Sequence, residues 1–301
     1  MPTIGGGSVI QFNSIIFATD FSPASQNAGL YASAISVRFG ARLVIAHAFT
    51  LVQAALEVEA EKPLASKQRI NLNRDLTLTA EALDDGQGIG ETVLLDGDPR
   101  RVIPVLAQRM SPALIVLGTH GGGSLDRFVL GSTAEGILRH SNGPALTVGP
   151  NVNILHAGAL DIRRILYATD GTTEAAHAAP VAVALAEAFS AELDVLNVVR
   201  SSEIDHPEQL RRLQERLYGA TAAILPHNAG QVCAPRTFVS VGQPHTEILK
   251  HVSEREIDLL ILGLRRNGHL GMQNQTSGAF PIIVECKCPV ITVATGSTYQ
   301  P

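Results

Sequence analysis

The sequence predicts an α/β fold with two tandem doubly wound domains, each built on a parallel sheet of five strands. The first observation is an internal repeat, because the segment IIFATD at residues 15–20 recurs as ILYATD at residues 165–170. Gly118 likewise recurs as Gly263. A repeat of this length indicates two duplicated domains and not a solenoid of short units. The second observation is that apolar strand-like runs alternate strictly with helix-like runs, which predicts a parallel sheet covered on both faces.

The first copy begins with a buried-strand pattern at residues 14–19. A helix follows, since Pro23 marks its start and apolar residues from Ala24 to Phe39 recur at helical spacing. The next strand is predicted at residues 43–49, and a second helix at residues 72–83, before a glycine-containing break. The remaining elements of this copy are predicted as a strand at 92–95, a helix at 99–109, a strand at 113–117, a helix at 132–140 and a strand at 145–148.

The second copy follows a predicted linker at residues 149–161, which contains Pro150 and Gly158. A leucine stripe at residues 210–217 marks its second helix. Its strands are predicted at 164–169, 193–199, 237–241, 258–262 and 290–294. We therefore predict one domain at residues 1–150 and a second at residues 151–301.

The composition is that of an ordinary globular protein, with 45% apolar and 17% charged residues. The net charge of −5 argues against nonspecific binding to nucleic acid. The sequence contains no apolar run of the roughly 18 residues needed to span a membrane, and residues 1–12 do not resemble a signal peptide. We therefore expect neither a nucleic-acid nor a membrane partner.

Three cysteines are too few for a disulfide framework, and this cysteine usage suits the cytoplasm. Cys286 and Cys288 form a Cys-x-Cys pair, but no further His or Cys lies at a recognisable ligand spacing. We interpret this pair as a helix end that leads into a strand after Pro289, and we predict no metal site.

A glycine-spaced stretch follows the predicted strand at 113–117. It reads Gly118-Thr119-His120-Gly121, and after nine residues it ends at Gly131-Ser132, where a helix is predicted to begin. Glycines allow backbone N–H groups to approach a phosphate, and a helix N-terminus favours negative charge. The spacing therefore predicts a phosphate-binding loop; the alternative is that these are ordinary turn glycines.

These motifs resemble the universal stress protein family, in its tandem two-domain form. The resemblance rests on Ala-Thr-Asp at 18–20, Gly-Asp-Pro at 97–99, the spacing G-x-x-G-x9-G-[ST] at 118–132 and Pro-Ala-Leu-Thr-Val at 144–148. It covers nearly the whole chain and implies an adenine nucleotide α-hydrolase-like fold with strand order 3-2-1-4-5. In that order, strands one and four are neighbours whose helices leave toward opposite faces, so a crevice opens at their carboxyl ends.

The resemblance further implies that the first domain binds ATP, with magnesium. Asp20 is placed at the adenosine end of the site, where it accepts from a base amino group or a ribose hydroxyl; alternatively it serves as a helix cap. We expect no catalytic role for His120, because no partner lies at triad spacing. The predicted nucleotide-contacting residues are Ala18, Thr19, Asp20, Ala48, Leu117, Gly118, His120, Gly121, Gly131, Ser132 and Thr133.

The second copy departs from the glycine motif. Arg266 stands where Gly121 stands in the first copy, and Thr276 stands where Gly131 stands. Pro281 also removes a backbone donor early in the following helix. We therefore expect the second domain not to bind ATP; residues 265–269, which include two arginines and a histidine, either hold a different anion or fill the pocket.

Three functions follow from these observations. The first is an ATP-binding stress-response or regulatory protein, in which the nucleotide stabilises one conformation that a protein partner recognises. The second is a slow ATP hydrolase or nucleotidyl-handling enzyme, although the sequence lacks a Walker A motif. The third is an interaction module without a ligand. The two domains are expected to form an intramolecular pair, and a homodimer stays open.

Overall fold

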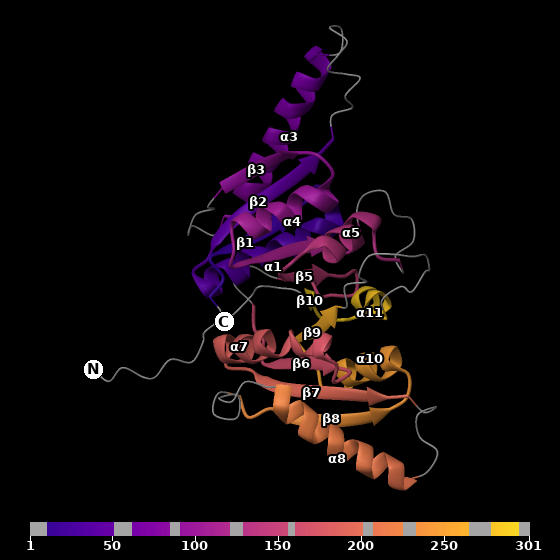
Figure 1. Cartoon of the computed structure of the whole chain (residues 1–301). Helices are drawn as coiled ribbons and strands as arrows, with labels where there is room; N and C mark the ends of the chain where they lie inside the picture. Colours follow the sequence, from indigo (N-terminus) through magenta and orange to yellow (C-terminus); the bar gives the residue numbers. More distant parts are fainter. Residues whose placement is uncertain are drawn as a thin grey trace, which may run out of the picture. The chain divides into compact units, whose positions relative to one another are not determined.

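The structure is a computed structural model that describes residues 11–50, 62–84, 91–120, 129–155, 160–200, 207–224, 233–264 and 278–294. These residues divide into two compact units, the first within residues 12–160 and the second from residue 161 onward (Figure 1). None of the described helices is long and apolar enough to cross a membrane.

The first unit has the predicted alternation of strands and helices. Its elements are β1 (Ser14–Ala18), α1 (Pro23–Phe39), β2 (Arg42–Phe49), α3 (Lys62–Leu83), β3 (Glu91–Asp96), α4 (Pro99–Arg109), β4 (Ala113–Gly118), α5 (Ser132–His140) and β5 (Pro144–Val148). The strands pair in parallel in the order β3-β2-β1-β4-β5, which confirms the predicted order. The helix α3 begins earlier than predicted, because its exposed residues 66–70 carry no apolar stripe from which to predict it.

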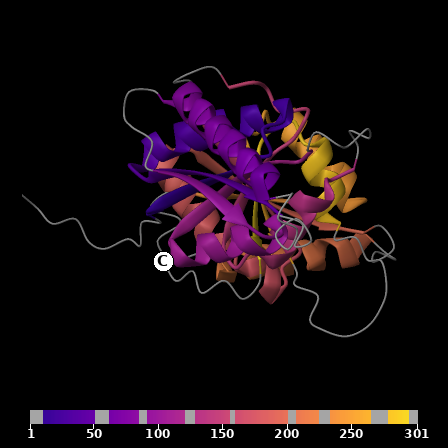
Figure 2. The same ribbon diagram turned by 90° about the horizontal axis from the view of Figure 1, so that it is seen from above.

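Helices cover both faces of this sheet. On one face, α1 packs against α3, since a Cβ placed on Gly29 would lie 3.0 Å from the side chain of Leu83. On the other face, α4 and α5 pack together, because the side chain of Arg100 lies directly over Gly136. Figure 1 shows α4 and α5 in front of the strands, and Figure 2 shows α3 from above, where it packs on β2 and β3. The strands β1, β4 and β5 between these layers are almost fully buried, whereas the edge strand β3 is partly exposed.

The segment after β5 is attached to the first unit through α1. The side-chain amide of Asn27 donates to the carbonyl oxygens of Val152 (3.5 Å) and Asn153 (3.2 Å), and its oxygen accepts from the backbone N–H of Leu155 at 3.1 Å. The hydroxyl of Tyr31 also donates to Asn153 at 3.4 Å. Residues 151–155, which the sequence assigns to the linker, therefore pack on the first unit.

The second unit repeats the first with one change. Its elements are β6 (Arg164–Thr169), α6 (Thr173–Ala176), α7 (Ala179–Phe189), β7 (Glu192–Val199), α8 (Pro207–Ile224), β8 (Arg236–Val241), α10 (Pro244–Glu254), β9 (Leu259–Leu264), α11 (Ala279–Glu285) and β10 (Val290–Ala294). Within the unit, β10-β9-β6-β7-β8 pair in parallel, which is the same order as in the first unit. The first helix is divided into α6 and α7 because Pro180 lacks the N–H that would continue it.

A glycine at the carboxyl end of the fourth strand, the last residue of β4 and the penultimate residue of β9, is required by packing in both units. A Cβ on Gly118 would lie 3.1 Å from the carbonyl oxygen of Ala24, in the first turn of α1. A Cβ on Gly263 would lie only 2.7 Å from the Cα of Ala175 in α6. The backbone of the first helix therefore lies directly against the fourth strand, and this explains why both copies keep this glycine.

Replacing Gly263 with alanine is therefore expected to destabilise the second unit. The methyl group must displace the backbone of α6, and overpacking of this kind costs about 1–3 kcal/mol. The matched variant Gly118→Ala should cost less, because its shortest contact is 3.1 Å, against 2.7 Å at Gly263. Urea unfolding followed by far-UV circular dichroism would measure both costs. Two neutral substitutions would contradict the packing explanation.

A buried charge cluster distinguishes the second unit from the first. Asp194 of β7 is only 1% exposed. Its Oδ1 accepts from Nε of Arg236 at 3.0 Å, and its Oδ2 lies 3.2 Å from Nε of Arg255 and 3.1 Å from Nε2 of His251. Burial raises the pKa of Asp194, but the hydrogen bonds from His251 and Arg236 outweigh it, so the net shift is downward. At the equivalent position of the first unit, β2 carries Val44.

The second and third strands of each unit also share an exposed ion pair, with reversed charges. In the first unit, Arg42 of β2 pairs with Glu91 of β3. In the second unit, Glu192 of β7 pairs with Arg236 of β8 at 2.5 Å. The cross-strand contact is therefore kept, while the strand that carries the positive charge is exchanged.

Candidate nucleotide site

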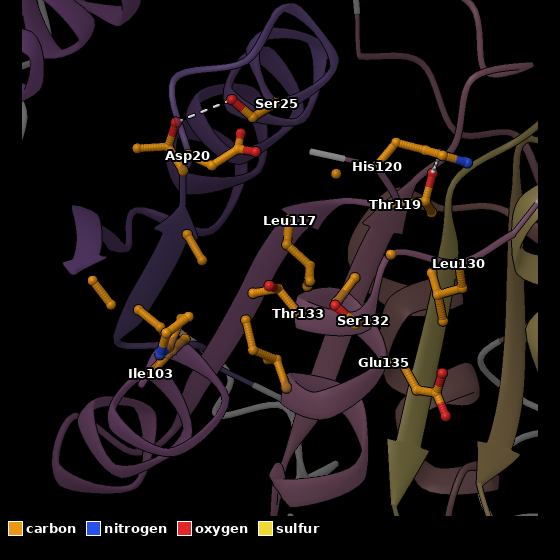
Figure 3. Close-up of a pocket in the computed structure, with 18 of the residues that line it drawn as sticks. Asp20, Ser25, Ile103, Leu117, Thr119, His120, Leu130, Ser132, Thr133 and Glu135 are labelled. Atoms are coloured by element: carbon orange, nitrogen blue, oxygen red, sulfur yellow. Dashed lines mark hydrogen bonds between the residues drawn. The ribbon is translucent and has the colours of Figure 1, made fainter. Parts of the chain in front are cut away.

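The candidate site lies where β1 and β4 end side by side. The two strands are neighbours, with Ala18 opposite Leu117. The chain leaves β1 into α1 on one face of the sheet and returns from β4 through α5 on the other. This reversal is the topological switch point at which ligands bind in open α/β sheets. A cavity of about 820 Å³ opens there (Figure 3), within the usual size range of small-molecule sites.

One end of the cavity is built from the segment after β1. The backbone N–H of Thr19 donates to Ala46 of β2 at 3.0 Å, and its hydroxyl lies 3.0 Å from that of Ser25. The exposed Asp20 accepts at Oδ1 from the backbone N–H of Ser22 (3.0 Å) and from its hydroxyl (2.6 Å). Ser22 in turn caps α1. The carboxylate is therefore held at the cavity edge by the same turn that starts the helix, so the ligand and cap interpretations of Asp20 are compatible.

The backbone of this turn is strained at one residue. Phe21 has φ of 63°, in the left-handed region that non-glycine residues rarely adopt. Its N–H donates to the hydroxyl of Thr19 at 3.0 Å, and its ring packs against the imidazole of His47 with 4.5 Å between centroids. Nδ1 of His47 lies 2.8 Å from the carbonyl oxygen of Thr19. In the second unit the equivalent residue is Gly171, with φ of 72°. Contacts with β2 thus hold the turn that carries Asp20.

The other end of the cavity is the N-terminus of α5. The N–H of Gly131 donates to the carbonyl oxygen of Thr119 at 2.9 Å, so the two ends of the glycine loop are joined. Gly131 is the N-cap residue, and among the described residues no side-chain cap hydrogen bond is made to the helix. The first-turn amides have no carbonyl partner within a helix, and Ser132 and Thr133 line the cavity here. Uncapped amides at a helix N-terminus form an anion-binding site.

The side wall is apolar and comes partly from α4. Pro99 and Ile103 line it, together with Ala46, Ala48 and Leu117. α4 is fixed at its start by Asp98, which accepts from the backbone N–H of Arg100 at 3.0 Å and from its guanidinium at 2.6–2.9 Å. These hydrogen bonds lower the pKa of Asp98 to about 2. The stabilising effect of this cap is therefore present above the ordinary carboxyl range and is lost as the pH falls through about 2.

The structure brings ten of the eleven predicted residues to this one cavity: Ala18, Thr19, Asp20, Ala48, Leu117, Gly118, His120, Gly131, Ser132 and Thr133. Gly121 lies outside the described residues, as do Asp126 and Arg127. His120 lines the cavity, but Nδ1 contacts the hydroxyl of Thr119 at 2.8 Å. In Figure 3 the imidazole ring points away from Asp20.

Sequence reasoning missed the contribution of α4 and one carboxylate. Pro99 belongs to the Gly-Asp-Pro motif, so its recurrence at residue 244 was a usable signal; Ile103 looks like any core residue of a helix. Glu135 also lines the cavity and forms an ion pair with Arg139 at 2.7 Å. Figure 3 shows Asp20 and Glu135 at opposite ends of the cavity. Among the described residues, no group of three or more potential metal ligands is found.

The corresponding region of the second unit is only partly described. Asp170 accepts from the backbone N–H (3.0 Å) and hydroxyl (2.6 Å) of Thr172, as Asp20 does from Ser22. Residues 265–277, which include Arg266 and Thr276, lie outside the described residues. The helix that follows them, α11, begins at Ala279, whereas the position equivalent to the start of α5 is residue 277. Pro281 is the third residue of this shorter helix.

The fold and cavity define a tandem α/β protein with a crevice at the switch point of its first sheet. The chain belongs to the universal stress protein family, whose sequence model matches residues 11–149 and again residues 161–294. Both predictions of family and fold class are thereby confirmed.

Individual relatives agree with this assignment. A universal stress protein of Thermus aquaticus is 32% identical over 138 residues, which are 46% of this chain and 98% of the relative. One from Methanocaldococcus jannaschii is 27% identical over 139 residues, which are 46% of this chain and 82% of the relative. Among solved structures, a universal stress protein from Archaeoglobus fulgidus superposes with a TM-score of 0.67 at 21% identity. That match covers 94% of this chain and 97% of the other, and it shows the likeness of fold.

Proposed function

We propose that the first unit binds one ATP molecule in the cavity at the ends of β1 and β4, and that the nucleotide regulates the protein. The observation that carries the proposal is that the two ends of one cavity have opposite chemistry: backbone N–H groups at one end and a carboxylate at the other. The uncapped N-terminus of α5 suits the negatively charged phosphates. The carboxylate of Asp20, at the other end, suits a ribose hydroxyl or a base amino group.

The wall between these ends supports a flat, apolar ring. Ala18, Ala46 and Ala48 leave room beside the strands because their side chains are small, while Pro99 and Ile103 supply an apolar surface. Backbone groups at the strand ends would then read the edge of an adenine base. Magnesium, in this proposal, is carried by the phosphates of the bound nucleotide.

Regulatory binding is preferred to hydrolysis because of where His120 lies. Its Nδ1 is engaged by the hydroxyl of Thr119 at 2.8 Å, so this nitrogen is not available to activate a water molecule at the phosphates. The protein would act by holding one conformation that a protein partner recognises. A phosphate-release assay separates the two functions: we expect no turnover, and turnover that is lost in His120→Ala would favour a hydrolase. The cytoplasmic location of the protein stays a prediction.

Titration calorimetry with ATP and magnesium is expected to give close to one site per chain. The first copy carries the complete glycine motif, while the second has Arg266 and Thr276 at two of its positions. Side chains there would occupy the space of the phosphates. Two equal sites, or none, would contradict the proposal. Parallel titrations with ADP and AMP would show how many phosphates the cavity recognises.

A further inference from the structure

The second unit contains two buried thiol groups in contact. Cys286 is the C-cap residue of α11, and Cys288 lies two residues later, just before β10 begins. Their Sγ atoms are 3.5 Å apart, and the residues are 0% and 5% exposed. The neighbouring Pro289 accepts from the N–H of Leu260 at 3.1 Å, so the corner is joined to the sheet.

The fold itself does not require these thiols. The first unit makes the same corner with Ser141 and Gly143, at the equivalent positions between α5 and β5. Ser141 is the C-cap there, and its hydroxyl donates to the carbonyl oxygen of Ile137 at 2.7 Å. A residue without a side chain suffices at the second position. The thiol pair is therefore an addition to a corner that forms without it.

The two thiols differ in acidity. The contact with the thiol of Cys288 lowers the pKa of Cys286, and the backbone N–H groups of Cys288 and Lys287 act in the same direction, against the raising effect of burial. The same contact, together with burial, raises the pKa of Cys288. Because the thiolate is the nucleophilic form of cysteine, the lowered pKa favours Cys286 over Cys288 as the attacking thiol.

From this geometry we propose that Cys286 and Cys288 form a dithiol site that hydrogen peroxide oxidises to an intramolecular disulfide. The Cys286 thiolate attacks one peroxide oxygen and breaks the O–O bond, which gives a sulfenic acid and, after protonation of the leaving oxygen, water. Sγ of Cys288 then attacks Sγ of Cys286 and displaces the hydroxyl group as a second water. The two thiols lose two electrons and two protons in total, and hydrogen peroxide is reduced to two water molecules.

The proposal does not depend on ATP binding, and Cys233 provides an internal control. Cys233 is more exposed than the pair, but burial and the nearby Glu187 raise its pKa to about 11. Oxidation governed by exposure alone would begin at Cys233. Oxidation governed by the contact between the thiols would spare Cys233 and consume the pair.

The test is to treat the folded full-length protein with hydrogen peroxide, block free thiols with iodoacetamide in denaturant, and digest with trypsin. Trypsin cuts after Lys287, between the two cysteines, so it separates peptide 267–287 from peptide 288–301. We expect the two peptides to stay joined until a reductant is added. If trypsin fails to cut after Lys287, the peptide 267–301 should be two hydrogens lighter than its reduced form, which also indicates the disulfide. Cys233 should be alkylated throughout.

The matched variants are Cys286→Ser and Cys288→Gly, which place the residues of the first unit at this corner. Both should fold with an unchanged circular dichroism spectrum, and neither should give joined peptides. The proposal is overturned if all three thiols are alkylated after a treatment that fully oxidises free glutathione. It is also overturned if Cys233 is the thiol that is lost.

Discussion

Aspartate in place of Gly131 is expected to abolish ATP binding while leaving the apo protein folded. Gly131 has φ of −58° and ψ of 139°, a conformation open to any residue and usual for an N-cap. Aspartate is among the best N-cap residues, so it should stabilise α5. Its carboxylate would, however, occupy the first-turn amides and repel the phosphates. We expect affinity to fall by about 100-fold or more, equivalent to roughly 3 kcal/mol, in titration calorimetry.

Two variants control for this result. Gly131→Asn has the same shape and also caps helices, but it carries no charge, so it should weaken ATP binding less than aspartate does. Thr276→Asp makes the matching change in the second copy and should leave the ATP affinity unchanged. Wild-type affinity in Gly131→Asp, or an equal loss in Thr276→Asp, would show that the phosphates are not held by α5.

Removing the guanidinium of Arg236 is expected to destabilise the second unit strongly. In Arg236→Ala, Oδ1 of Asp194 loses the donors that lie 2.9–3.0 Å away, while the carboxylate stays buried. Breaking a buried ion pair from one side costs about 3–5 kcal/mol; since His251 and Arg255 remain, we expect about 2–4 kcal/mol. Urea unfolding followed by circular dichroism would measure the loss, since the chain has no tryptophan.

The controls come from the same cluster. Glu192→Ala breaks only the exposed partner of Arg236, so it should cost at most about 1 kcal/mol. Asp194→Val installs the residue that the first unit carries and removes the buried charge itself, so it should cost less than Arg236→Ala. The double variant should then be no less stable than Asp194→Val alone. Additive losses would mean that Arg236 acts through packing and not through Asp194.

The pH dependence of this cluster has a definite sign. The folded protein lowers the pKa of Asp194 below its ordinary value of 3.8, so the unfolded chain takes up a proton first as the pH falls. The stabilising contribution is therefore complete above the ordinary value and declines below it. In Asp194→Val this part of the acid sensitivity should be absent.

The sequence predicted the fold well because its signals were local and duplicated. Apolar runs of strand length, the glycine at the carboxyl end of each fourth strand and the Thr-Asp pair after each first strand recur in both copies. Each element assigned in one copy can therefore be checked against the equivalent segment of the other copy. The strand order was predicted from the family resemblance, and the order of the described strands in each unit agrees with it.

The candidate site was predictable where backbone geometry determines it. Gly131 directly precedes α5, and Asp20 lies in the turn between β1 and α1, so the sequence signals for these boundaries also locate both residues. Ile103 and Glu135 could not be predicted, because only the packing of α4 against α5 brings them to the cavity. Gly118 shows the opposite limit: it was interpreted as a phosphate glycine, yet its close contact with α1 explains it independently of any ligand.

The reversed ion pairs of the two units bear on how a duplicated chain avoids folding incorrectly. Tandem copies of one fold are prone to exchange equivalent strands during folding. If β3 were to pair with β7 in the native register, Glu91 would lie directly opposite Asp194 and diagonal to Glu192; if β8 paired with β2, Arg236 would lie opposite Val44 and diagonal to Arg42. Like charges directly opposite each other destabilise a strand pair. The exchange of sign therefore selects against mixed sheets, while each strand still finds its proper neighbour within its own unit.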